Sequence, residues 1–292
     1  MTLDPPIVRL ELESRPETPA LVRAMLGGLA ERLGSDPELL DDLKTAVSEA
    51  CNNVVLHAYP GAGGPLTVLL YASEREIEVV VRDRGTGIPP DAPSQGVGMR
   101  VVQALAERAT FWSPPGGGTE VSMTFAAVRE GKPLLITPPS PAPEDAWERR
   151  LAAEANGISG DVVGSVSPVG LLTGVLGRLG RALAIRARFS LDRFADVYLV
   201  TDAVTDHAAR NAQGGRIAFA ISARARRLEL KIGPLRAGPS AGPDARRSEG
   251  GARAGSPPLA LLSDELEQIR VGGSELLRVA LLDPPRSRPP AG

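Results

Sequence analysis

Alternating apolar and polar residues predict a sheet in the first 130 residues of the chain. Residues 7–14, IVRLELES, alternate over their whole length and predict an edge-type strand. Two strand-like runs, residues 66–73 and 76–85, flank a short polar turn and predict a hairpin. A last strand is expected over residues 119–127, TEVSMTFAA. These four runs predict the strands of one sheet.

Three stretches between these strands have the spacing of apolar residues that is typical of helices. The first covers residues 18–34, with Thr18 as the expected N-cap. The second covers residues 36–59 and begins at Asp36, and the third, residues 98–109, follows a Gly/Pro-rich loop. The order strand, two helices, two strands, loop, helix and strand predicts an α+β fold built as a two-layer α/β sandwich.

Pro-rich and low-complexity segments divide the rest of the chain. Residues 131–145 are rich in proline and predict a semi-stiff linker, and residues 144–156 predict a short helix. Residues 236–258 have the composition of a disordered segment. The expected organisation is a first domain at 1–130, a linker at 131–158 and a second domain at 159–285.

An internal repeat relates the second domain to the first. LLDDLKTAVSEACNNVVLHA resembles SLDRFADVYLVTDAVTDHAA, and LTVLLYASEREIEVVVRDRGTG resembles RIAFAISARARRLELKIGPLRAG. GGTEVSMTF resembles GGSELLRVAL, and the three matches keep their order along the chain. The sequence therefore predicts a tandem repeat of one fold.

Composition limits the classes of function. The 33 basic and 35 acidic residues nearly cancel, which does not indicate a nucleic-acid-binding or membrane-surface protein. Cys51 is the one cysteine, so an intrachain disulfide is excluded and a reducing compartment is expected. With neither a signal peptide nor an apolar run of ~20 residues, we expect a cytoplasmic protein without direct contact to nucleic acid or membrane.

Glu49, Asn53 and His57 share one flank of the second predicted helix, at spacing i, i+4 and i+8. An amide oxygen is a neutral ligand suited to Mg²⁺, and a carboxylate one turn away can accept a proton from a hydroxyl group or water. The alternative is that these polar residues merely face solvent. The helix alone leaves both interpretations open.

Two glycine motifs follow along the chain. RDRGTGI contains Asp83, Gly85 and Gly87 at the end of an apolar strand, where glycines permit a sharp turn and close approach to a ligand. QGVGMRVVQALAE contains Gly96 and Gly98 at the start of a helix, whose N–H groups and dipole favour an anion. Each motif alone is weak, and the first, taken alone, is more typical of a turn that ends a strand because D-x-G-x-G is short.

The order of the motifs is more specific than any one of them. E-x-x-x-N on a helix, D-x-G-x-G after a strand, G-x-G before a helix and GGGT before a last strand resemble the GHKL ATPase superfamily. Within it, SEACNNVVLHAYPG, VRDRGTGI, GVGMRVVQALAE and GGGTEVSMTF are most similar to the anti-sigma-factor serine/threonine kinases. The resemblance covers roughly residues 8–127.

This resemblance implies the Bergerat ATP-binding fold, with helices on one face of a mixed sheet, and ATP and Mg²⁺ as ligands. Glu49 would be the catalytic base, Asn53 would hold Mg²⁺ and through it the ATP phosphates, and Asp83 would bind the adenine amino group. The remaining implied positions are Gly85 and Gly87 at the adenine, Gly96 and Gly98 in the phosphate loop, and Thr119 near the adenine.

The function implied is an ATP-binding anti-sigma regulatory factor that phosphorylates an anti-anti-sigma-type protein on serine or threonine and binds a sigma factor. The alternative is a non-catalytic module in which ATP only sets the affinity for a partner. A sensor histidine kinase is disfavoured, because the chain has only His57 and His207 and no phosphoacceptor helix precedes the domain. His57 is assigned a structural role at the helix end, and residues 89–98 are the expected lid.

The second copy is expected to be degenerate, keeping the fold but losing ATP binding. Overlaying the repeats puts Asp202 and Asp206 where the first copy has its carboxylate and amide. Pro234 falls where Asp83 should bind adenine, and Arg236 falls on the first loop glycine. Because the similar stand-alone kinases work as dimers, the chain is expected to be either a homodimer or an intramolecular pseudo-dimer. A partner-docking surface is the other role expected for the second copy.

Overall fold

One antiparallel sheet forms the centre of the structure, a computed structural model that describes residues 5–33, 36–73, 75–87, 96–127, 158–236, 259–271 and 273–284. Its ten strands run in the order β4-β5-β3-β2-β1-β6-β7-β8-β10-β9. Their bounds are β1 (Val8–Glu13), β2 (Pro65–Ala72), β3 (Glu76–Asp83), β4 (Arg108–Trp112), β5 (Glu120–Ala126), β6 (Val162–Val166), β7 (Ile217–Arg224), β8 (Arg227–Arg236), β9 (Glu265–Val271) and β10 (Ser274–Leu282). Every pair of neighbouring strands is antiparallel, so the mixed sheet that the resemblance implies is wrong.

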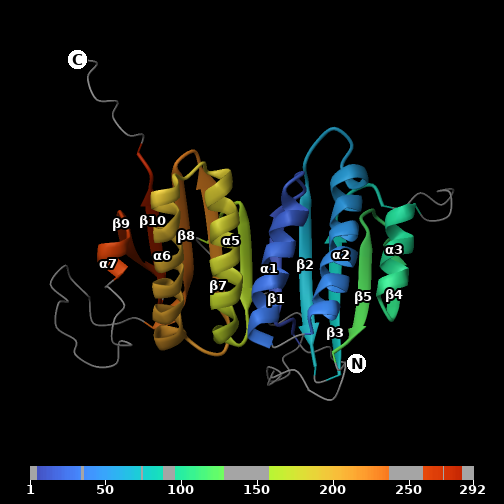
Figure 1. The fold of residues 1–292 in the computed structure, drawn as a ribbon, viewed down its shortest axis with the longest axis horizontal. Coiled ribbons are helices and arrows are strands. Elements are labelled where there is room, and N and C mark those ends of the chain that lie inside the picture. Colours follow the sequence, from blue (N-terminus) through green and yellow to red (C-terminus); the bar gives the residue numbers. More distant parts are fainter. Residues whose placement is uncertain are drawn as a thin grey trace.

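Helices form a second layer in front of this sheet in Figure 1. They are α1 (Thr18–Leu33), α2 (Pro37–Asn53), α3 (Val97–Leu105), α5 (Leu172–Arg186), α6 (Leu191–Asn211) and the short α7 (Leu259–Leu262). Apolar side chains of the two layers meet in one core, which confirms the predicted α+β sandwich. Among the described residues, no helix has both the length and the apolar character that a membrane span needs.

β1 lies in the middle of the sheet, although its sequence pattern predicts an edge strand. β2 pairs with it on one side and β6 on the other. The alternation correctly reports that one face of β1 is buried and the other carries charge, where Arg9 donates a hydrogen bond to Glu11. It says nothing about β6, which comes from a distant part of the chain, and this is why the edge prediction fails.

The second helix begins where the sequence predicts and ends in an unexpected way. Asp36 is its N-cap, and the Asp36 carboxylate accepts a hydrogen bond of 2.8 Å from the N–H of Glu38. The α-helical part ends at Asn53, and Val54–Ala58 form a π-helical turn. Such wide turns inside α-helices are frequent at functional sites, because they redirect the side chains that follow.

The third helix is shorter than the predicted range of 98–109. α3 ends at Leu105, and Arg108–Trp112 form strand β4, which pairs with β5 at one edge of the sheet. The sequence of β4, RATFW, contains a β-branched and two aromatic residues, which favour strands. Its side chains alternate between exposed and half-buried positions, a period that the helical interpretation of this segment missed.

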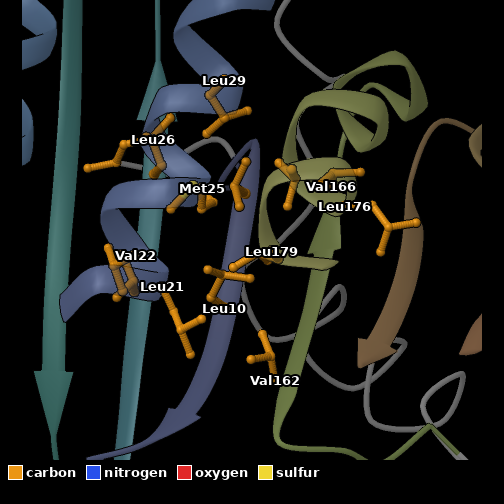
Figure 2. Packing of buried hydrophobic residues seen from close by; sticks show 14 of the residues in the cluster. Leu10, Leu21, Val22, Met25, Leu26, Leu29, Val162, Val166, Leu176 and Leu179 are labelled. Atoms are coloured by element: carbon orange, nitrogen blue, oxygen red, sulfur yellow. The ribbon is translucent and has the colours of Figure 1, made fainter. Parts of the chain in front are cut away.

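The two halves of the chain meet at the middle of the sheet. Leu10 of β1 lies opposite Gly164 of β6. Over this strand pair, α1 and α5 approach so closely that a Cβ atom on Gly28 would lie 2.0 Å from the carbonyl oxygen of Gly174. Figure 2 shows buried side chains of both halves in one cluster: Leu10, Leu21, Val22, Met25, Leu26 and Leu29 beside Val162, Val166, Leu176 and Leu179.

Both halves have the same strand order. Outward from the junction, the first half runs β1-β2-β3-β5-β4 and the second runs β6-β7-β8-β10-β9. The helix pair α1 and α2 corresponds to α5 and α6, while the four residues of α7 stand in the position along the chain that α3 has in the first half. This is the arrangement that a repeat predicts, and the origin of the second half as a degenerate copy stays a prediction.

Several predicted segments lie outside the described residues. They are most of the linker at 131–158, the short helix at 144–156, most of the low-complexity tract at 236–258 and most of the lid at 89–98. The predicted domain bounds therefore stay predictions.

Candidate functional site

A pocket of about 390 Å³ opens where α2, the end of β3 and the start of α3 meet. The polar residues Asn53, Asp83 and Thr119 line it together with Gly87 and Gly96. Its apolar walls are Ala50, Val54, Val81, Met99, Phe111 and Val121. A cavity with apolar walls and a few polar groups is typical of sites for small ligands.

Glu49 and Asn53 meet at the N-terminus of α3. A Cβ atom on Gly98 would lie 2.8 Å from Glu49 Oε2 and 3.6 Å from Asn53 Oδ1, so both side chains reach the same glycine. Their spacing on α2 puts them on one flank of the helix, as predicted. The N-terminus of a helix offers free N–H groups and a positive dipole end. A carboxylate, an amide and an anion-binding helix end are therefore together at one place.

Asp83 is the last residue of β3 and is held in a fixed orientation. Its Oδ1 accepts a hydrogen bond of 2.7 Å from the N–H of Gly85, and its own N–H donates to the carbonyl oxygen of Thr119 at 2.9 Å. No donor among the described residues reaches Asp83 Oδ2. That oxygen is therefore free to accept a hydrogen bond from a ligand in the pocket.

Gly85 and Gly87 build a turn that only glycines permit. A Cβ atom on Gly85 would lie 2.1 Å from the carbonyl oxygen of Ala58, which accepts a hydrogen bond of 3.0 Å from Thr86. Gly87 has a φ of +77°, in the left-handed region. The N–H of Gly118 donates to the carbonyl oxygen of Gly85 at 2.7 Å, which fixes the turn to the GGGT segment.

Tyr59 supports this turn, a role that the sequence analysis did not assign. Its hydroxyl oxygen accepts a hydrogen bond of 2.8 Å from the N–H of Arg84 and donates to the carbonyl oxygen of Pro65 at 2.6 Å. Burial raises the pKa of Tyr59, so the hydroxyl keeps the proton that it donates. The residue was recognisable only as part of the HAY segment that follows the amide.

His57 and the apolar walls are the other differences from the sequence analysis. His57 belongs to the π-helical turn, as expected for a residue at the helix end, but it also lines the pocket. Met99 and Phe111 line the pocket too. Sequence reasoning missed Met99 because an isolated apolar residue near a helix start carries no signal of its own.

The polar groups of the pocket are of the types that could hold a nucleotide with its metal ion. Among the described residues, no group of three or more His, Cys, Asp or Glu side chains offers a metal ion an all-protein site. Mg²⁺ commonly takes one or two protein oxygens and completes its shell with water and phosphate oxygens. The amide oxygen of Asn53 next to a phosphate-binding helix end fits that preference.

The second half lacks a counterpart of Asp83. In the first half, Arg82 of β3 pairs with Thr67 of β2, and Asp83 follows. In the second half, Gly233 of β8 pairs with Ala218 of β7 at the equivalent position, and the residue that follows is Pro234. Pro234 therefore stands where the first half has Asp83. A proline side chain accepts no hydrogen bond. This agrees with the sequence overlay of the two hairpins.

The helix overlay, in contrast, needs a correction. The buried residues of α2 and α6 align at a separation of 154 positions: Leu43, Ala46, Val47, Ala50 and Val54 with Val197, Val200, Thr201, Val204 and Ala208. At this separation Ala203 and His207, rather than Asp202 and Asp206, stand where the first half has its carboxylate and amide. The overlay was shifted by one residue because it followed acidic residues instead of buried ones.

The first half of the chain is similar to known proteins. Residues 12–125 match the family described as "Histidine kinase-like ATPase domain". The chain is 29% identical over 138 residues to an anti-sigma F factor of Clostridium acetobutylicum. This match covers 42% of this chain and 96% of that protein. It is 40% identical over 101 residues to the serine-protein kinase RsbW of Listeria innocua, and 38% identical over 82 residues to RsbW of Bacillus pumilus. These two matches cover 34% and 27% of this chain, and 64% and 51% of the RsbW proteins, so the chain spans less than two thirds of their length.

Proposed function

Since residues 12–125 match the family described as "Histidine kinase-like ATPase domain", we propose that the chain is a cytoplasmic, ATP-binding anti-sigma regulatory factor with serine/threonine protein kinase activity toward an anti-anti-sigma-type partner. The observation that carries this proposal is the meeting of Glu49 and Asn53 at Gly98 of α3, in the pocket region that Asp83 also lines. The names of the similar proteins, an anti-sigma factor and serine-protein kinases, support it.

In the proposed reaction, Asp83, Asn53, Glu49 and the N-terminus of α3 each have one task. Asp83 Oδ2 accepts a hydrogen bond from the adenine amino group, while the N-terminus of α3 binds the phosphates. Asn53 Oδ1 would hold Mg²⁺, and the ion would supply neutralisation of the charge on the phosphates. Glu49 accepts the proton of the acceptor hydroxyl, whose oxygen bonds to the terminal phosphorus as ADP leaves. The partner of this reaction is the anti-anti-sigma-type protein.

We expect the variant Asp83→Asn to bind ATP more weakly. The new amide keeps an acceptor oxygen for the N–H of Gly85, but it presents a second donor to the adenine amino group instead of an acceptor. Loss of a hydrogen bond to a charged group corresponds to about 1.5–3 kcal/mol. Isothermal titration calorimetry with Mg·ATP measures this directly.

Asp41→Asn is the matched control, because it removes the same charge from an exposed carboxylate of α2 outside the pocket. Its ATP affinity should equal that of the wild type. Unchanged affinity in Asp83→Asn would show that adenine is bound elsewhere.

We also propose that the second half takes the place of a second subunit, as an intramolecular pseudo-dimer, and binds no ATP itself. The junction through β1 and β6 and the replacement of Asp83 by Pro234 support this. The full-length chain should bind one ATP per molecule in the same titration. A stoichiometry of two would mean that the second half retains a nucleotide site.

A further inference from the structure

Large apolar side chains of α5 and α6 are exposed to solvent on the outer face of these helices. The exposed fractions are 91% for Leu191, 56% for Tyr198 and 43% for Leu199 on α6, and 68% for Ile185 on α5. Leu191, Tyr198 and Leu199 are spaced i, i+7 and i+8, so they lie along one side of α6. The two helices pack side by side at the surface of the second half (Figure 1). We call these four residues the α5–α6 stripe.

The first half shows that the fold does not require this stripe. At the 154-position separation that aligns the buried residues of the two halves, Ile185 corresponds to Glu31 and Leu191 to Pro37. Tyr198 and Leu199 correspond to Lys44 and Thr45. Three of the four positions are therefore charged or polar in the first half and apolar in the second. Exposed apolar residues that gather on one surface mark an interaction site more often than scattered ones do.

A basic pocket of about 270 Å³ lies beside the stripe, between α1, α5 and α6. Arg32, Arg178 and Arg181 line it together with the carboxylates of Glu31 and Asp202, and Tyr198 belongs to both the pocket and the stripe. Arg178 pairs with Glu31. In the described part of the chain, neither Arg32 nor Arg181 has a carboxylate within ion-pair distance.

Arg181 is the guanidinium that joins the pocket to the stripe. Its Cζ atom lies 5.6 Å from the centre of the Tyr198 ring, a cation–π contact that holds both side chains in place. Burial and the neighbouring charge of Arg178 lower the pKa of Arg181. An incoming carboxylate would offset that repulsion, whereas an incoming ammonium group would add to it.

We propose that the α5–α6 stripe binds an amphipathic helix of a partner protein, and that an acidic side chain beside the apolar face of that helix enters the basic pocket. A helix laid against a helix pair is a common mode of recognition, with apolar anchors at i, i+3, i+4 and i+7. Tyr and Arg are the residue types that most often dominate such interfaces. The site lies outside the nucleotide pocket, and it would exist whether or not the first half is a kinase.

The test is a selection of helical peptides from a display library on the full-length chain, after which the affinity of each selected peptide is measured for the wild type and for the variant Tyr198→Lys/Leu199→Thr. This variant installs the residues that the first half carries at the same positions. Selected peptides should combine an apolar stripe with a flanking Asp or Glu. Fluorescence anisotropy should show that their affinity for the double variant and for Arg181→Ala is lower than for the wild type by about tenfold or more. The Leu266→Thr control removes an exposed leucine of β9 and should bind like the wild type.

Three results would overturn the proposal. The first is a selection that yields no peptide or only peptides without acidic residues. The second is equal binding to wild type and double variant. The third is evidence that the stripe binds something else: the wild type self-associates in sedimentation equilibrium or binds anionic vesicles, and the double variant does neither. Thermal unfolding and ATP binding of each variant, both expected to equal the wild type, exclude misfolding as the cause.

Discussion

Replacing Glu49 with glutamine is expected to leave ATP binding intact and to slow phosphoryl transfer by about 10²–10⁴-fold. Glutamine has nearly the same shape as glutamate, so the contact with Gly98 and the position of Asn53 should persist. The amide cannot accept the proton of the acceptor hydroxyl, and the hydroxyl is a poor nucleophile while it keeps that proton. The loss should therefore appear in the rate of transfer and not in the affinity for ATP.

Single-turnover transfer from labelled ATP to an anti-anti-sigma-type acceptor, combined with calorimetric ATP binding, separates these two quantities. Glu38→Gln is the matched control, because it makes the same substitution on the exposed first turn of the same helix. Transfer at the wild-type rate in Glu49→Gln would assign the base to another group. If the wild-type chain binds ATP but transfers no phosphate to any acceptor, the nucleotide-gated binding module becomes the correct function.

The second large effect is expected at the crossing of α1 and α5. A methyl group on Gly28 would lie 2.0 Å from the carbonyl oxygen of Gly174, and a backbone atom cannot rotate away as a flexible side chain can. The helices must therefore separate in Gly28→Ala, at a cost of about 1–3 kcal/mol in the free energy of unfolding. Urea denaturation followed by circular dichroism measures this change.

Gly27→Ala provides the control one residue away on the same helix. There the added Cβ would meet only Lys44 Cε, at an ordinary contact distance of 3.7 Å. Alanine is a better helix former than glycine by up to ~1 kcal/mol, so this variant should be as stable as the wild type or more stable. Opposite signs for the two variants are the expected result. Equal stability changes would mean that the two halves are not packed together as described.

Local patterns predicted most of the first half and the polar groups of its pocket. Glu49 and Asn53 come together because helical spacing alone places them on one flank, and Asp83, Gly85 and Gly87 keep their neighbourhood because they are adjacent in the chain. The turn predicted at Gly85 and Gly87 has a local steric reason: a Cβ atom on Gly85 would lie too close to Ala58, and Gly87 has a left-handed φ, which favours glycine. Such features need no knowledge of the distant chain.

The failures concern pairings between distant segments and details of backbone geometry. Nothing in the local sequence of β1 indicates that β6 pairs with it. β4 was missed because the helix was predicted to continue to residue 109, past the start of this strand. The π-helical turn at Val54–Ala58 differs from an α-helix by its hydrogen-bond pattern and not by a residue type that marks it. The overlay of α2 with α6 failed because it matched acidic residues, whereas the buried residues of the two helices align one position further along.

The pairing of β1 with β6 within a single chain has a consequence for cells that make few copies of this protein. Two separate chains that associate through edge strands come apart when their concentration falls below the dissociation constant. Here both strands belong to one polypeptide, so the effective concentration of one half around the other is set by the covalent connection and does not change on dilution. The first half therefore stays beside its companion even at very low abundance, and their ratio is fixed at one to one by translation itself.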